Sequence, residues 1–190
     1  MKKEKLKDYI LHLEKWIPEK TLKKTLKEIK TKQWIPHTHF NSLTFKKIIK
    51  KNELDRMLPD NSLACKKEIH DLIWKALEKY ILKKFKNKYH KGWSGFSGVN
   101  FNRYRNNQLM TKHCDHITSL FDGERRGIPV LSMIGALNDD YQGGEFIMFD
   151  DYEIKLKKGD FLLFPSVFLY PHLVKPVTKG TRYTFVSWSW

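Results

Sequence analysis

The sequence predicts one α+β domain of 190 residues, in which a mainly helical portion, residues 1–91, packs on a β-rich portion, residues 92–190. Apolar residues of the first portion recur at spacings of three and four, which is typical of amphipathic helices. The second portion holds short runs rich in aromatic and β-branched residues, separated by turn-forming residues. Many short strands at near-regular spacing favour a barrel or sandwich, and with no repeat or linker the two portions are expected to form one unit.

Four helices are expected in residues 1–91, three from an apolar stripe on one face and the third along the chain from an N-cap signal at Asn41 or Ser42. Proline is tolerated in the first turn of a helix, and lysines suit a helix C-terminus. Helices are therefore expected at about residues 6–17, from Pro18 to about Ile29, from Asn41 or Ser42 towards Leu54, and from after Ser62 to an end among Lys84, Lys86 and Lys88, with an extended segment at 33–40.

The β-rich portion opens with a glycine cluster and continues as short apolar runs between turn signals. One of these signals is Gly143-Gly144, which is typical of a hairpin turn. Strands are expected at residues 96–105, 130–137, 145–149, 153–157, 161–165, 171–175 and 182–190.

The net charge of +15 is unevenly placed, because residues 1–91 hold 25 Lys and Arg against 11 Asp and Glu. This excess is compatible with a nucleic-acid partner or with solvated helix faces. Nearly all of it is lysine, whereas specific phosphate and base contacts favour arginine. No apolar run is long enough to span a bilayer, no secretory signal is recognised, and two cysteines predict no disulfide framework. An intracellular, cytoplasmic setting is expected.

Four potential metal ligands lie in the stretch KHCDH at residues 112–116. In an extended chain, His113 and Asp115 point to one face, and Cys114 and His116 point to the other. A metal needs a third ligand, and His172 is the one further histidine of the β-rich portion. Two imidazoles and one carboxylate with open positions favour a non-haem Fe(II) site that activates O₂.

A second feature of the same portion is Arg182, ten residues after His172. An arginine buried among apolar residues needs an anion. Its planar guanidinium fits a carboxylate end-on. A dicarboxylate that chelates iron at one end and meets Arg182 at the other is therefore expected.

An ordered series of motifs runs through residues 98–190: Tyr104, His113-x-Asp115, Leu137-Asn138, Asp140-Tyr141-x-Gly143-Gly144-Glu145, Gly159-Asp160-x-Leu162-x-Phe164-Pro165, His172, and Pro176-Val177-Thr178-x-Gly180-x-Arg182-Tyr183. His-x-Asp alone is weak evidence for a protein family, but the whole series of motifs in this order is specific evidence. It resembles the Fe(II)- and 2-oxoglutarate-dependent dioxygenases, in particular the prolyl 4-hydroxylase-like branch. The resemblance implies a double-stranded β-helix (jelly-roll) core with helices packed on one sheet.

The resemblance also implies roles for individual residues. Fe(II) would be held by His113, Asp115 and His172, and Arg182 would pair with the C5 carboxylate of 2-oxoglutarate. The co-substrate would also meet the Tyr104 hydroxyl, with Thr184 as a further hydrogen-bond donor and Trp188 as a wall of the iron pocket. Such enzymes use O₂ to convert 2-oxoglutarate to succinate and CO₂ while an aliphatic C–H bond is hydroxylated. A protein or peptide side chain such as prolyl is the expected substrate, and ascorbate is a candidate additive.

The sequence differs from related enzymes at three places, and these differences restrict the expected reaction and substrate. Asp115 argues against halogenating relatives, in which alanine or glycine opens a halide position. Trp188 stands where nucleic-acid repair demethylases carry a second arginine. Met110 and Thr111 stand where many prolyl hydroxylases carry a further tyrosine, so the target need not be proline. The alternatives are an oxygenase acting on a nucleotide or other small molecule, and a non-catalytic basic module that binds nucleic acid.

Other polar residues have simpler interpretations. His116 is expected to be a bystander, and Cys114 a small buried residue that faces away from the metal. His37 and His39 form another His-x-His pair without a visible carboxylate partner, so they are expected on the surface or in a loop. Arg125-Arg126 lies in the loop 118–129, which is either solvated or a lid over the pocket.

Overall fold

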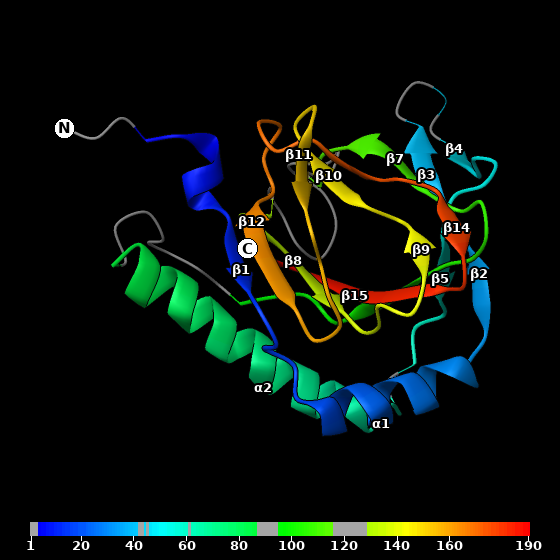
Figure 1. The fold of residues 1–190 in the computed structure, drawn as a ribbon, viewed down its shortest axis with the longest axis horizontal. Coiled ribbons are helices and arrows are strands. Elements are labelled where there is room, and N and C mark those ends of the chain that lie inside the picture. Colours follow the sequence, from blue (N-terminus) through cyan, green and yellow to red (C-terminus); the bar gives the residue numbers. More distant parts are fainter. Residues whose placement is uncertain (1–3, 42–43, 45, 61, 87–94, 116–128) are drawn as a thin grey trace.

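The protein is described by a computed structural model that covers residues 4–41, 44, 46–60, 62–86, 95–115 and 129–190. Two antiparallel sheets face each other, and two helices cover the outer face of the larger sheet (Figure 1). The predicted α+β class with helices packed on one sheet is confirmed. Of the helices described, none is both long and apolar enough to cross a membrane.

The larger sheet has seven strands in the order β1-β12-β8-β15-β6-β5-β2. Three of its strands come from the N-terminal portion, so this portion extends the sheet as well as covering it. The strand bounds are β1 Leu11–Leu13, β2 Trp34–Pro36, β5 Asp55–Met57, β6 Asn100–Tyr104, β8 Leu131–Ala136, β12 Phe161–Pro165 and β15 Arg182–Ser189.

The smaller sheet has four strands in the order β11-β10-β13-β7, and two further pairs join β14 to β9 and β3 to β4. Six of the seven strands expected between residues 96 and 190 fall on strands of matching position, and the seventh, 153–157, begins one residue early as β11. The bounds are β3 His39–Asn41, β4 Lys46–Ile48, β7 Met110–His113, β9 Gln142–Gly143, β10 Phe146–Met148, β11 Tyr152–Ile154, β13 His172–Val174 and β14 Val177–Lys179.

The helices are α1, Glu19–Lys30, and α2, Cys65–Glu78, which continues as the π-helix η2, Lys79–Lys84. Both helices were predicted. In the structure, Pro18 precedes α1 in an extended conformation, and the apolar stripe of α2 is buried from Ile69 to Leu77. Their inner faces pack with the larger sheet in one apolar cluster.

Two other helix predictions are wrong. Residues 6–17 form a 3₁₀ helix, Leu6–Tyr9 (η1), followed by β1, because Leu11–Leu13 pairs with β12 at the edge of the larger sheet. Residues 41–54 include β4 and no helix among the described positions. Ile48 and Ile49, which would belong to the apolar face of such a helix, are exposed in the observed fold.

The expected hairpin turn at Gly143-Gly144 is also wrong. Gly143 belongs to β9 and pairs with Val177 of β14, and the amide of Gly144 donates to the carbonyl of Pro176. A Cβ added to Gly143 would lie 2.3 Å from that carbonyl oxygen, so glycine permits the two segments to approach closely.

The central strand β15 separates two apolar clusters. Its residues Tyr183 and Phe185 pack toward the helices, whereas Val186 packs in the cluster between the sheets. The alternation of the strand therefore leaves Arg182, Thr184, Val186 and Trp188 on the face that looks into the space between the sheets.

Gly135 of β8 faces Phe185 across the pair β8–β15. We expect Gly135→Ala to destabilise the fold, because the new Cβ would lie 2.1 Å from Cε1 of a fully buried ring. Overpacking of this kind costs about 1–3 kcal/mol, which urea denaturation would measure. The control is Gly98→Ala, whose Cβ would meet nothing within 4 Å. Equal losses in both variants would contradict the overpacking argument.

Candidate active site

Three of the predicted site residues meet where the smaller sheet pairs β7 with β13. His113 ends β7, Asp115 follows two residues later, and His172 begins β13 as the register partner of His113. Asp115 Oδ1 lies 3.3 Å from His113 Nε2 and 3.7 Å from His172 Nε2. One donor atom from each residue lies within 4.8 Å of the others, so the set fits one metal ion.

Backbone carbonyls orient both histidines. His113 Nδ1 lies 2.8 Å from the carbonyl oxygen of Thr111, and His172 Nδ1 lies 3.2 Å from that of Tyr170. A proton on each Nδ1 would leave Nε2 free to act as ligand, which is the usual arrangement around metal-bound histidine.

Burial and neighbouring charges set the pKa of each residue of the triad. Burial raises the pKa of Asp115, but the two neighbouring histidines and hydrogen bonds outweigh it and hold the pKa well below its usual range. Burial lowers the pKa of His172 to about 4. Burial also opposes protonation of His113, but its hydrogen bond to Asp115 outweighs this effect and raises the pKa. A carboxylate and neutral His172 are thus present at neutral pH, and metal binding at His113 would compete with its protonation.

Arg182 is buried, with 2% of its surface exposed, at the start of β15. Its guanidinium carbon lies 4.8 Å from the ring centre of Tyr104, the partner residue on β6. Its Nε has no hydrogen-bond partner, and none of its nitrogens forms an ion pair with a described carboxylate. A buried cation in this condition fits an anionic ligand.

The glycine at position 144 makes room for this arginine. An added Cβ would lie 3.1 Å from Arg182 Cδ and 3.0 Å from Val177 Cγ2, in a backbone conformation with φ +69°. The close approach explains the second glycine of the Gly-Gly-Glu motif better than a turn does.

A cavity of about 350 Å³ joins these groups. The residues predicted as ligands, co-substrate contacts or pocket wall all line it: His113, Asp115, His172, Arg182, Tyr104, Thr184 and Trp188. Burial raises the pKa of Tyr104 to about 12, so its hydroxyl stays a donor. Trp188 is half-buried, and its Nε1 has no hydrogen-bond partner within the described chain.

Some predictions near the site need correction. Cys114 is half-exposed rather than buried, lines the cavity, and lies with Sγ 3.4 Å from the carbonyl of Phe168. His37 lies in the connection between β2 and β3, as expected for a loop residue, and His39 begins β3, but both are half-buried and line the same cavity. His116 and the loop 118–129 lie outside the described residues, so the lid interpretation stays a prediction.

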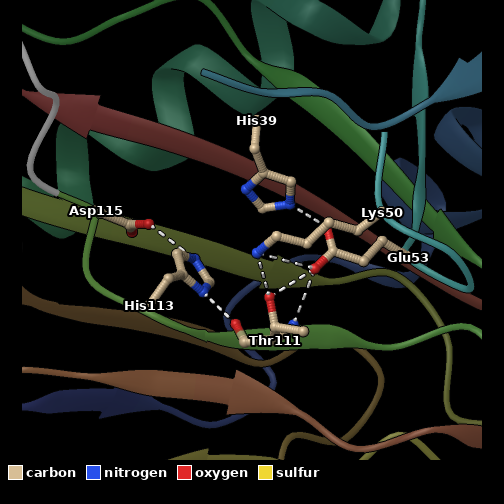
Figure 2. A network of polar contacts seen from close by, with 6 residues as sticks. All are labelled: His39, Lys50, Glu53, Thr111, His113 and Asp115. Atoms are coloured by element: carbon tan, nitrogen blue, oxygen red, sulfur yellow. Dashed lines mark hydrogen bonds and ion pairs between the residues drawn. The ribbon is translucent and has the colours of Figure 1, made fainter. Parts of the chain in front are cut away.

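Sequence reasoning missed the contribution of Glu53. Its carboxylate contacts His39 Nε2 and accepts hydrogen bonds from the hydroxyl of Thr111 at 2.6 Å and its amide at 3.4 Å (Figure 2). Thr111 in turn orients His113 through its carbonyl. Glu53 therefore connects the N-terminal portion to a predicted metal ligand, and only the fold brings it there.

The comparisons with known proteins agree with this geometry. The family model of the 2OG-Fe(II) oxygenase superfamily matches residues 99–190, which include the triad and Arg182. Residues 99–190 are therefore similar in sequence to the 2OG-Fe(II) oxygenase superfamily.

Curated relatives are named PKHD-type hydroxylases. The protein of Idiomarina loihiensis is 36% identical over 93 residues, which is 47% of this chain and 40% of that protein. The protein of Aliarcobacter butzleri is 37% identical over 97 residues, covering 47% of this chain and 41% of that protein. The match thus spans about two fifths of the length of these relatives.

Solved structures share the fold over nearly the whole chain. The viral collagen prolyl hydroxylase of Paramecium bursaria Chlorella virus-1 has a TM-score of 0.69 at 16% identity, over 95% of this chain and 94% of its own. The prolyl-4-hydroxylase of Pseudomonas putida has a TM-score of 0.68 at 15% identity, over 95% and 91%. The prolyl hydroxylase of Trichoplax adhaerens, solved with a peptide fragment of hypoxia inducible factor, has a TM-score of 0.71 at 14% identity, over 96% and 84%. The predicted double-stranded β-helix fold is confirmed.

Proposed function

We propose that the protein is an Fe(II)- and 2-oxoglutarate-dependent dioxygenase that hydroxylates an aliphatic C–H bond. The observation that carries the proposal is the triad His113, Asp115 and His172 in one cavity with a buried Arg182 that has no carboxylate partner among the described residues. A metal site alone would not need Arg182, and an anion site alone would not need the triad.

The proposal gives a role to each of the predicted site residues that line the cavity. His113, Asp115 and His172 would hold Fe(II), with the two imidazoles oriented by the carbonyls of Thr111 and Tyr170. Bound Fe(II) supplies the oxidative chemistry, in which O₂ and 2-oxoglutarate give succinate, CO₂ and a hydroxylated substrate.

The remaining residues bind and shield the co-substrate. Arg182 would pair with the C5 carboxylate, and the hydroxyls of Tyr104 and Thr184 would donate hydrogen bonds to 2-oxoglutarate. Trp188 and the apolar lining from β8, β10 and β13 would limit the access of water.

We infer a protein or peptide side chain as the substrate, with prolyl as one candidate. Support comes from the fold shared with prolyl hydroxylases, one of which was solved with a peptide. The assay is succinate formation in air with Fe(II), 2-oxoglutarate and ascorbate, with a peptide library beside a nucleotide panel. Turnover stimulated only by nucleotides would replace the peptide proposal, and failure to bind Fe(II) or consume 2-oxoglutarate would contradict the dioxygenase itself.

The Lys-rich N-terminal portion supports one alternative, a basic module that binds nucleic acid. Contacts to phosphates predict binding that falls steeply with salt, which a gel-shift titration would measure. We further propose that residues 1–190 act as a single unit in an intracellular setting. The N-terminal strands β1, β2 and β5 within the larger sheet support the single unit.

Tyr104→Phe should raise the KM for 2-oxoglutarate about tenfold, since a hydrogen bond to a charged group contributes about 1.5–3 kcal/mol. The ring that faces Arg182 stays in place, so the fold should not change. The matched control is Tyr152→Phe, an exposed tyrosine of β11. Equal KM values for the Tyr104→Phe and control proteins would remove the hydroxyl from the co-substrate site.

A further inference from the structure

A second set of potential metal ligands lies in the wall of the cavity, apart from the triad. One donor atom from each of His37, His39 and Glu53 lies within 4.8 Å of the others. The rings of His37 and His39 are 4.7 Å apart and nearly perpendicular. None of these residues lies in the part of the chain that matches the superfamily model.

Backbone contacts hold the three residues together. The amide of His37 donates to the carbonyl of Leu54. The amide of Leu54 donates to the carbonyl of Leu109, whose own amide donates to the carbonyl of Asn52. Glu53 itself forms a backbone bridge to Leu109, two residues before Thr111. The ligand-bearing segments are therefore part of one hydrogen-bonded layer and are not independent loops.

The donor set is one that divalent transition metals use. Two imidazoles and one glutamate with an open position form a common zinc arrangement, and imidazole also suits nickel, copper and iron. The Glu53 side chain is 1% exposed and that of His39 is 19% exposed, so the site is shielded from solvent. In the metal-free protein, His39 Nε2 contacts the Glu53 carboxylate directly, and both atoms would turn to a bound ion.

One nearby charge opposes a cation. The ammonium of Lys50 lies 4.0 Å from Glu53 Oε1 and 3.2 Å from the Thr111 hydroxyl (Figure 2). It approaches Oε1, whereas His39 contacts Oε2, so the two contacts use different oxygens. The Lys50 side chain is 43% exposed and is free to turn toward solvent.

We propose that His37, His39 and Glu53 form a second divalent-metal site, of zinc type, in the wall of the candidate active-site cavity. His37 and His39 line the cavity, so the open coordination positions of the ion would face it and would accept an anionic or carbonyl oxygen of a substrate. Because Glu53 also holds Thr111, the second ion would be connected to His113 through one residue.

The test is the number of Zn²⁺ ions bound by the metal-free full chain, measured by equilibrium dialysis and elemental analysis. Wild-type protein should bind two ions, His37→Gln and Asp115→Ala one each, and the double variant none. The control is His70→Gln on α2, outside the cavity, which should bind two. Zinc-edge X-ray absorption of the double variant His113→Ala/Asp115→Ala, in which the triad keeps a single histidine, should show two imidazole ligands.

The outcomes separate the two sites. A wild type that binds one ion, lost in Asp115→Ala and kept in His37→Gln, overturns the second site and leaves the proposed function intact. A single ion lost only in His37→Gln supports the second site and contradicts the metal triad. An oxygen-only shell in the absorption spectrum, or two ions retained by His37→Gln, also overturns the second site.

Lys50→Gln provides a further test that does not rely on losing a ligand. Removing the ammonium should tighten Zn²⁺ binding in the Asp115→Ala background by at least about fivefold, because a positive charge beside Glu53 repels a bound divalent cation even in a water-like medium. Unchanged or weaker binding would overturn the proposal, because a network without an ion needs the lysine for charge balance.

Discussion

Asp115→Ala should abolish 2-oxoglutarate turnover, with a loss of at least about 10³-fold. The substitution removes the one anionic ligand of the triad and leaves two imidazoles 4.4 Å apart between ring centres. Charge stabilisation at a bound metal contributes several kcal/mol, and each 1.36 kcal/mol corresponds to a factor of ten. Succinate formation measures the effect on turnover, and Mn²⁺ titration calorimetry measures the effect on metal affinity.

The matched control for this variant is Asp151→Ala, in the exposed turn before β11. It should retain wild-type turnover and metal affinity. Thermal unfolding of both metal-free variants checks that they are folded. Metal binding by folded Asp115→Ala at wild-type affinity, with turnover intact, would show that the triad is not the catalytic metal site.

The sequence allowed the prediction of this triad because its three members lie in strands whose local patterns are clear. His113 and Asp115 are two residues apart, so strand alternation alone places them on one face. His172 was found because few histidines stand in the β-rich portion, and the family resemblance supplied its role. The register between His172 and His113 then brings the ligands together.

The sequence did not predict that the N-terminal portion supplies a wall of the same cavity. Glu53 lies 58 residues from Thr111, and their contact exists only because residues 52–54 pair with Leu109. His37 and His39 have no carboxylate nearby in sequence, so their pairing with Glu53 requires the tertiary fold. A local pattern carries no information on such a contact.

The two wrong helix predictions have a related physical cause. The segment at residues 6–17 has a helical spacing of apolar residues, but Leu11 and Leu13 lie in the edge strand of the larger sheet. They pair there with Leu163 and Phe161. Backbone hydrogen bonds to β12 satisfy this segment better than an isolated short helix would. Intrinsic propensity is a weak prior, and a sheet edge overrides it.

Arg182 gives the second large expected effect. Arg182→Met should raise the KM for 2-oxoglutarate by about 10²–10⁴-fold, because the C5 carboxylate would lose two charge-assisted hydrogen bonds of about 1.5–3 kcal/mol each. The KM of Arg182→Lys should lie between those of wild type and Arg182→Met, since an ammonium keeps the charge but cannot donate in the planar, bidentate geometry. Steady-state kinetics with varied 2-oxoglutarate measures both variants. A KM within threefold of wild type for Arg182→Met would remove Arg182 from the co-substrate site.

The stability of the ligand-free Arg182→Met protein distinguishes a binding role from a structural one. In the free protein the arginine is 2% exposed, its Nε has no hydrogen-bond partner, and the guanidinium faces the ring of Tyr104. Removing a buried cation without a partner charge should leave the free energy of unfolding unchanged or increase it. 2-Oxoglutarate should stabilise the wild type against urea and have little effect on the variant, since only a bound ligand shifts the equilibrium. A ligand-free variant several kcal/mol less stable than wild type would instead make Arg182 a structural residue, and its effect on KM would then follow from the damaged fold.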